Sequence, residues 1–110
     1  MVLLLYRILK LLWQVVAHYK MLHKIYIGHN NSTKKLETLK ALKIVNKYFE
    51  GYTSYKGLGY WQGKAEKTLI LEIETTNNKT IVKCCKELAD KLKQQAIGLA
   101  KIGEMQFISV

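Results

Sequence analysis

The sequence has no proline, a single arginine, a single aspartate and only two cysteines among its 110 residues. With one arginine, few planar guanidinium groups are present to make bidentate contacts to guanine or phosphate, which argues against an arginine-based nucleic-acid surface. Cys84 and Cys85 are adjacent, so they cannot bridge on a helix and lack the two-residue spacing of a redox or zinc pair. We expect one packed thiol and one nearer the surface.

Signatures of catalysis and metal binding are also missing. His18, His23 and His29 do not have the spacing of metal ligands on one helix, and Asp90 lies among lysines in a helical segment. No serine or cysteine has a base that the sequence identifies as its partner. The sequence therefore favours a protein that is not an enzyme and that uses no cofactor or metal.

Lysine is abundant instead. Seventeen lysines and Arg7 against eight acidic residues give a formal net charge of +10. Such an excess favours polyanions, anionic membranes or small phosphorylated ligands as partners. The alternative is that an AT-rich genome supplies lysine codons freely and that most lysines only solvate the surface.

Residues 1–20 differ from the rest of the chain. Arg7, Lys10, Gln14 and His18 recur at steps of three, four and four, which aligns them on one stripe of an otherwise apolar helix. The charges interrupt the apolar run before it is long enough to span a membrane, and no secretory cleavage site follows it. Two interpretations remain: a basic amphipathic helix on a membrane surface, or an extension upstream of a start at Met21.

Residues 21–110 predict one domain. A strand ends at Gly28, a polar connection over residues 29–33 supplies N-cap residues, and a helix continues to about Phe49. A hairpin follows, with strands over residues 53–62 and 66–75 and a turn at residues 62–65. A second helix begins after the capping stretch 76–80, and residues 96–110 form a last strand with a break at Gly103 and Glu104.

The apolar periodicity predicts which residues face the core. Period two places Leu69, Leu71 and Ile73 on one face of the hairpin, and Thr68, Ile70, Glu72 and Glu74 on an open face. The expected buried faces of the helices are Leu36, Leu39, Leu42, Val45 and Phe49 in the first and Ile81, Cys85, Leu88, Leu92 and Ala96 in the second. The order strand, helix, strand, strand, helix, strand predicts an α+β, ferredoxin-like βαββαβ sandwich with two helices on one face of an antiparallel sheet.

The segments GYTSYKGLGYWQG (51–63) and KIGEMQFISV (101–110), in this order of elements, resemble the PII nitrogen-signal and CutA copper-tolerance families. That resemblance implies the fold of residues 21–110 and a homo-oligomer, since both families are trimers. Gly103, Glu104 and Phe107 match the first glycine, the acid and the aromatic residue of the PII Gly-Asp-Gly-Lys strand. Met105 and Gln106 replace its second glycine and its lysine, so the resemblance does not imply ATP binding of the PII type.

The loop from Gly28 to Lys35 is the candidate ligand site. If the helix begins after Thr33, Lys34 and Lys35 lie in its first turn, where the helix dipole disfavours positive charge and an anion would relieve it. The candidate ligand-binding residues are His29, Asn31, Ser32, Thr33, Lys34 and Lys35, with Tyr60 or Trp61 for stacking. The loop matches no Walker or dinucleotide glycine pattern, so the alternative is that it only caps a helix.

Aromatic residues and lysines also alternate along the hairpin, at Tyr52, Tyr55, Lys56, Tyr60, Trp61, Lys64 and Lys67. Bases could stack on these rings as they do in ferredoxin-like RNA-binding modules, but Glu72 and Glu74 would repel a phosphate backbone. The favoured interpretation is that the open face is a homo-oligomer interface, in which aromatic rings fill the contact and glutamates pair with lysines.

These observations favour a non-enzymatic binding protein for a nucleotide or another small anion, acting as a sensor or a sequestering protein. A small, lysine-rich domain without catalytic groups would suit a phage or mobile element, where sequestering a host nucleotide needs only affinity. An RNA- or DNA-binding module and a membrane-attached interaction module, docked through residues 1–20, are the alternatives. The expected location is cytoplasmic, with membrane association through residues 1–20 as the alternative.

Overall fold

The computed structural model describes residues 2–17, 20–94 and 97–104. Its helices and strands are α1 (Val2–Ala17), β1 (Met21–Gly28), α2 (Thr38–Val45), β2 (Thr53–Trp61), β3 (Lys64–Thr75), α3 (Asn78–Lys91) and β4 (Gly98–Glu104). From β1 onward the order of elements is the one that the sequence predicted. Two parts of the predictions lie outside the described residues: the predicted core residue Ala96, and residues 105–110, which belong to the segment compared with the PII family.

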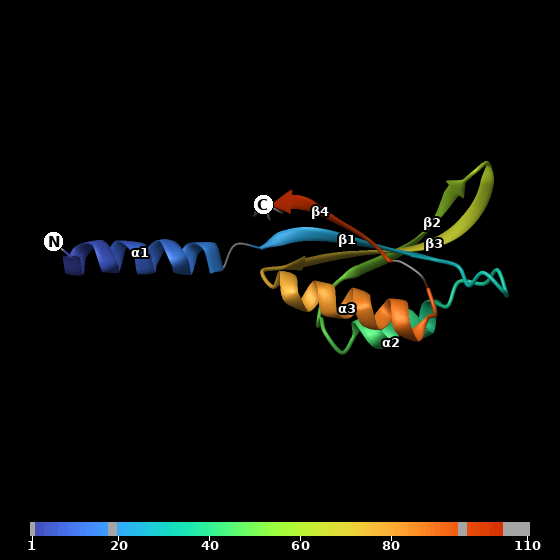
Figure 1. Ribbon diagram of the computed structural model, residues 1–110, viewed down its shortest axis with the longest axis horizontal. Helices are drawn as coiled ribbons and strands as arrows, with labels where there is room; N and C mark the ends of the chain where they lie inside the picture. Colours follow the sequence, from blue (N-terminus) through green and yellow to red (C-terminus); the bar gives the residue numbers. More distant parts are fainter. Residues whose placement is uncertain (1, 18–19, 95–96, 105–110) are drawn as a thin grey trace, which may run out of the picture.

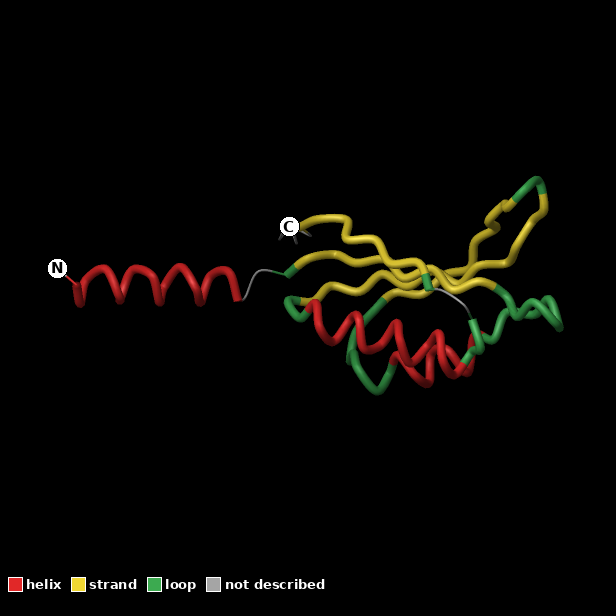
Figure 2. The backbone as a smooth tube through the Cα atoms, viewed as in Figure 1, coloured by secondary structure: helices red, strands yellow, loops and turns green. Residues whose placement is uncertain are grey.

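The four strands form one antiparallel sheet in the order β2-β3-β1-β4. Helices α2 and α3 lie together against one face of this sheet, and the opposite face is open (Figures 1 and 2). The chain is therefore a mixed α+β protein with a four-stranded antiparallel sheet, compatible with the predicted ferredoxin-like fold. We call the two surfaces of the sheet the covered face and the open face.

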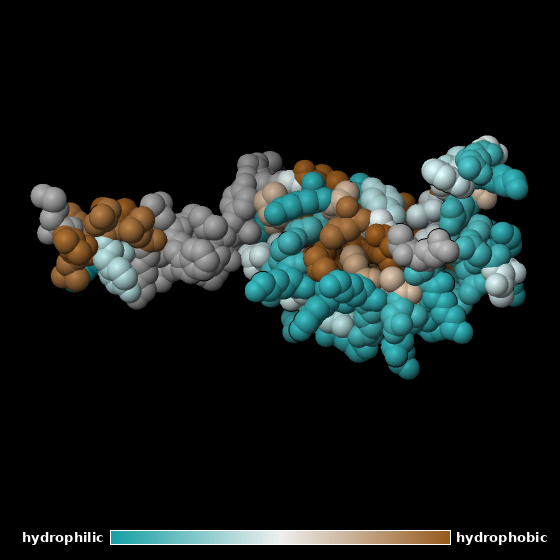
Figure 3. Space-filling view, in the orientation of Figure 1, coloured by the Kyte–Doolittle hydropathy of each residue, from teal (hydrophilic) through white to brown (hydrophobic). Residues whose placement is uncertain are grey.

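Helix α1 extends beyond the end of the sheet at which β1 begins (Figure 1). Its side chains from Val2 to Leu9 are all exposed, including the leucines at positions 3, 4 and 5 (Figure 3). No described helix is both long enough and apolar enough to cross a membrane.

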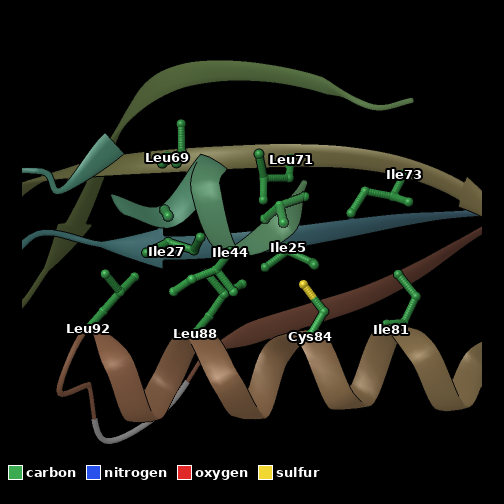
Figure 4. Packing of buried hydrophobic residues seen from close by; sticks show 12 residues of the cluster. Ile25, Ile27, Ile44, Leu69, Leu71, Ile73, Ile81, Cys84, Leu88 and Leu92 are labelled. Carbon is green, nitrogen blue, oxygen red and sulfur yellow. The ribbon is translucent and has the colours of Figure 1, made fainter. Parts of the chain in front are cut away.

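The core lies between the covered face and the two helices. Its members are buried aliphatic side chains and one thiol, and they come from β1, β3, α2, α3 and the residue after α3 (Figure 4): Ile25, Ile27, Leu69, Leu71, Ile73, Ala41, Ile44, Val45, Ile81, Cys84, Leu88 and Leu92. The period-two prediction for β3 is therefore confirmed, because Leu69, Leu71 and Ile73 are at most 1% exposed.

The hairpin between β2 and β3 has a tighter turn than predicted. Only Gln62 and Gly63 lie outside the strands, with φ angles of 50° and 76°. Two consecutive positive φ angles are typical of a type I′ turn, whose twist matches that of the flanking strands. Lys64 and Ala65 consequently pair with Trp61 and Tyr60, so β3 begins two residues earlier than expected.

Helix α2 is shorter than predicted at both ends, because it begins at Thr38 and ends at Val45. The loop before it is held by Asn30, whose Oδ1 accepts hydrogen bonds from the backbone N–H groups of Ser32 (2.9 Å) and Thr33 (3.1 Å). Short polar side chains that bind nearby backbone groups in this way compete with helix formation. The prediction that Lys34 and Lys35 lie in the first turn of the helix is therefore wrong.

The buried faces of the helices also differ from the prediction. In α2 the buried residues are Ala41, Ile44 and Val45, whereas Leu39 is 86% exposed. The buried thiol of α3 is Cys84, and Cys85 is half-buried, which confirms one packed and one more accessible cysteine. Among the other predicted core residues of this segment that the structure describes, Ile81, Leu88 and Leu92 are buried as expected.

The capping stretch before α3 is confirmed. Asn77 is the N-cap, and its Oδ1 accepts a hydrogen bond from the backbone N–H of Thr80 at 3.1 Å. At the other end of the domain, β4 shifts register opposite Leu22 and His23, next to Gly103 with a φ of 139°. The predicted break at Gly103 and Glu104 thus coincides with this irregularity, and the residues that would form a second short strand lie outside the described part of the chain.

Replacement of Ile44 and Leu39 by alanine tests the corrected face of α2. Ile44→Ala should lower the free energy of unfolding by about 2–5 kcal/mol, because it leaves a cavity in the core. Leu39→Ala, on the same helix but exposed, should change it by less than about 0.5 kcal/mol. Chemical denaturation monitored by circular dichroism measures both values, and equal losses would contradict the assignment.

The two cysteines should differ in reactivity. Burial raises the pKa of the Cys84 thiol to about 12 and also raises the pKa of Cys85. At pH 8 iodoacetamide should therefore modify Cys85 before Cys84 in the native protein, as read by mass spectrometry, because the thiolate is the nucleophile. Modification of Cys84 as fast as in the unfolded chain would contradict this difference in reactivity.

The stability of the fold should also depend on the protonation of Cys84. The stability that the protonated Cys84 thiol contributes should be present below pH 9 and be lost as the pH rises towards 12.

Candidate functional site

The candidate site lies where the β2–β3 hairpin extends beyond the end of β1. Gly28, the last residue of β1, pairs with Thr68, so residues 64–67 of β3 have no β1 partner. The loop that follows β1 occupies the space beside this overhang. Loop and hairpin enclose a cleft of about 450 Å³, which we call the hairpin-tip cleft; it is lined by His29, Asn31, Lys34, Trp61, Gln62, Lys64, Ala65 and Glu66.

Backbone hydrogen bonds fix the shape of the loop. The N–H of Asn30 donates to the carbonyl oxygen of Lys35 at 2.8 Å, and the N–H of Lys34 donates to the carbonyl oxygen of Asn30 at 2.7 Å. Lys34 has a φ of 60°, in the left-handed region that few non-glycine residues adopt. After this bend the two neighbouring lysines line different clefts: Lys34 lines the hairpin-tip cleft and Lys35 lines another one.

Strand pairing decides which aromatic ring reaches the site. Trp61 pairs with Lys64 and Tyr60 with Ala65, so the two neighbouring rings lie on opposite faces of the hairpin. Trp61 lines the hairpin-tip cleft and is 71% exposed, which leaves its indole face free to stack on a planar group. Tyr60 does not line this cleft.

The charges around the hairpin-tip cleft are mixed. Lys34 and Lys64 supply two ammonium groups, and Glu66 supplies one carboxylate. The Glu66 carboxylate lies over Gly28, where a Cβ atom would come within 2.2 Å of Oε1, so the glycine leaves room for it. The carbonyl oxygen of Gly28 also accepts a hydrogen bond from Nε2 of Gln94 at 2.6 Å, which ties the end of β1 to the segment after α3.

The structure thus brings together four of the predicted site residues, His29, Asn31, Lys34 and Trp61. Ser32, Thr33, Lys35 and Tyr60 do not line the hairpin-tip cleft. The backbone N–H groups of Ser32 and Thr33 already donate to Asn30, so they are not available to a ligand. The helix dipole, which first suggested the site, plays no part in it.

Sequence reasoning missed Lys64 and Glu66 as members of the site. It placed Lys64 within a four-residue turn and Glu66 at the start of the next strand, whereas the structure pairs them with Trp61 and Gly59. The available signal was the dipeptide Gln62-Gly63, since a glycine in a two-residue hairpin turn would have fixed the register. Asn30 belongs to the connection that was predicted to cap a helix, and its side chain instead organises the loop.

A second polar arrangement lies on the open face. The hydroxyl of Tyr55 donates to Oε1 of Glu72 at 2.8 Å, and Nζ of Lys24 lies 3.5 Å from the same oxygen. The hydrogen bond to the carboxylate raises the pKa of Tyr55. The open face therefore holds a glutamate–lysine pair within the chain itself, whereas the pairing predicted from the sequence is between subunits.

Within the described residues there is no group of three or more His, Cys, Asp or Glu side chains that could hold a metal ion. His23 lies in the core at 2% exposure, where its Nδ1 is 2.9 Å from the carbonyl oxygen of Met21. It is therefore remote from the hairpin-tip cleft and is part of the packing under the helices.

No protein-family model matches the chain, and no curated protein is significantly similar to it. Among solved structures the chain is similar to the de novo designed protein Foldit4, at 12% identity and a TM-score of 0.45, over 78% of this chain and 97% of that one. It is also similar to the divalent ion tolerance protein CutA1 from Ehrlichia chaffeensis, at 10% identity and a TM-score of 0.45, over 81% of this chain and 86% of that one. The predicted resemblance to CutA proteins is thus confirmed as a weak similarity of fold.

Proposed function

We propose that the protein is a non-enzymatic binder of a small anionic ligand of the nucleotide type, and that the hairpin-tip cleft is its site. The observation that supports this most is the convergence of Lys34 and Lys64 with the exposed ring of Trp61 on one cleft. Ammonium groups bind phosphate through charge-assisted hydrogen bonds, and an indole ring stacks on a base.

Glu66 narrows the class of ligand. A carboxylate in the cleft repels a bare phosphate but accepts hydrogen bonds from a ribose hydroxyl or a base amino group. With His29 and Asn31 as further polar partners, the cleft suits a ligand that has an anionic part and a hydrogen-bond donor part. A nucleotide has these two parts at separate places, whereas inorganic phosphate has no separate uncharged part.

The side chains that line the cleft offer charge, hydrogen bonds and a stacking surface for holding a ligand. Holding a ligand without converting it is the task of a sensor or a sequestering protein. A small and lysine-rich domain that sequesters a nucleotide would be economical for a phage or mobile element, where abundance and affinity suffice.

Native mass spectrometry of the full chain, purified from its own host, tests the proposed function. We expect a retained adduct of nucleotide mass, and calorimetry with the compound so identified then gives its affinity. The double variant K34Q/K64Q should bind about 100-fold more weakly, because two charge-assisted hydrogen bonds are lost. Trp61→Ala should also weaken binding.

The matched control for this experiment is K83Q/K86Q, which removes the same charge from exposed positions of α3. Its affinity should equal that of the wild-type protein. Absence of any adduct, or equal weakening by both double variants, would contradict the proposed site. An affinity for a partner that falls steeply as the salt concentration rises would favour the RNA- or DNA-binding alternative. Sedimentation with membranes that depends on residues 1–20 would favour the membrane-attached alternative.

We also propose that the protein forms a homo-oligomer through the open face. Tyr26 and Tyr55 both pair with Ile70, so the three side chains form an apolar row across the sheet, and the tyrosines are 38% and 39% exposed. Beside this row the carboxylate of Glu72 is already paired with Lys24 and Tyr55, which lowers the cost of covering it. Aromatic residues are enriched in such interfaces.

Light scattering coupled to gel filtration tests the oligomer. The wild-type protein should have the mass of a defined multimer, and the variant Y26K/Y55K should have the mass of a monomer, because two lysines would be buried without partners. Leu39→Lys, on the exposed side of α2, is the control and should keep the wild-type mass. A monomeric wild-type protein would refute the proposed interface.

A further inference from the structure

A second cleft, on the covered side of the hairpin, is lined by lysines without an acidic residue among them. This cleft of about 470 Å³ is lined by Lys35, Leu36, Lys56, Gly57 and Lys67, and we call it the three-lysine cleft. It shares no lining residue with the hairpin-tip cleft. No aromatic side chain lines it, so a ligand there would be recognised by charge and not by stacking.

Strand register shows why the lysines converge. Lys56 pairs with Leu69, which is buried under the helices, so Lys56 lies on the covered face. Lys67 pairs with Leu58 on the next row of the same face, which makes Lys56 and Lys67 diagonal neighbours. Lys64 and Glu66 alternate with Lys67 along β3 and therefore lie on the open side, in the hairpin-tip cleft.

The third lysine comes from the loop after β1. The carbonyl oxygen of Lys35 accepts a hydrogen bond from the N–H of Asn30. The N–H of Lys35 donates to Oγ1 of Thr33 at 3.3 Å. Leu36, the next residue, packs against the hydrophobic core. The backbone that carries Lys35 is thus held on both sides, and the cleft is shaped before any ligand arrives.

No acidic side chain lines the three-lysine cleft. In the part of the chain that the structure describes, the ion pairs are Lys24 with Glu72 and Lys47 with Glu87, so the three lysines have no carboxylate partner there. Three positively charged side chains around one cleft repel one another, and attraction to an anion between them would offset that repulsion.

The groove between α2 and α3 shows the contrasting case. It is lined by lysines at positions 40, 43, 47 and 91, but Glu87 lies among them. Its carboxylate forms an ion pair with Lys47 and accepts a hydrogen bond from the hydroxyl of Tyr48 at 2.7 Å. The chain therefore supplies a counterion to the helix groove and none to the three-lysine cleft.

We propose that Lys35, Lys56 and Lys67 form a second anion-binding site, separate from the nucleotide-type site, for a ligand with several adjacent negative charges such as a di- or triphosphate. Three convergent ammonium groups match a chain of phosphates better than a single carboxylate. This site goes beyond the proposed function, since it contains neither the stacking ring of Trp61 nor the carboxylate of Glu66.

Titration of the full chain with inorganic triphosphate, followed by the amide resonances of ¹⁵N-labelled protein, tests the second site. The amides of Lys35, Leu36 and Gly57 should shift and saturate together. The double variant K56Q/K67Q should weaken the binding seen at these amides at least about tenfold, because two charge-assisted contacts are lost.

Two controls make the result specific. K83Q/K86Q on α3 removes the same charge elsewhere, and K34Q/K64Q removes the lysines of the other cleft; both should leave the affinity at Lys35 and Gly57 within about twofold, since neither pair lines this cleft. If K56Q/K67Q does not fold, Lys35→Gln in the exposed loop replaces it and should weaken binding about fivefold or more.

Either of two outcomes would overturn the second site. Shifts confined to Asn31, Lys34 and Trp61 would place the anion in the hairpin-tip cleft alone and leave the proposed function intact. Equal weakening by K83Q/K86Q would show attraction to the overall positive charge and no built site. Loss of nucleotide binding in K34Q/K64Q, measured separately, decides the proposed function independently of both.

Discussion

The pairing of β1 with β3 is the interaction on which the rest of the structure depends. It sets Ile25 opposite Leu71 and Ile27 opposite Leu69, so both central strands turn aliphatic side chains to the same face. That face is what α2 and α3 cover, and their buried residues would have no partner without it. Burial of each of these large aliphatic side chains contributes about 1.5–3 kcal/mol to the stability of the fold.

The same pairing positions both clefts. Because β1 ends opposite Thr68 while β3 begins at Lys64, the tip of the hairpin projects past its neighbour, and the loop held by Asn30 lies beside the projection. The hairpin has two faces, and one cleft lies on each of them. Because the backbone bends at Lys34, Lys34 lines the hairpin-tip cleft and Lys35 lines the three-lysine cleft.

The positions of the carboxylates, more than the number of lysines, determine which lysines are paired within the chain and which could contact a ligand. Glu72 and Glu87 are occupied by lysine and tyrosine partners of the open face and of the helix groove. Glu66 lines the hairpin-tip cleft, and no acid lines the three-lysine cleft. Within a chain of net charge +10, the two clefts therefore differ chemically: lysines and a carboxylate line one, and lysines alone supply the charge of the other.

Local patterns in the sequence were sufficient to predict the order of the elements from Met21 onward, the covered face of β3 and the N-cap at Asn77, because alternation and capping act over a few residues. They also selected His29, Asn31, Lys34 and Trp61. They failed where the outcome depends on contacts across the fold or on a competing loop. The side chain of Asn30 delayed the start of α2 to Thr38, and packing against the sheet buried Ala41 and Ile44 in place of Leu39. Only the tertiary structure decided that Lys64 and Glu66 join the loop residues and that Lys35 joins Lys56 and Lys67, because strand register and a left-handed bend place residues that are distant in the sequence around the same space.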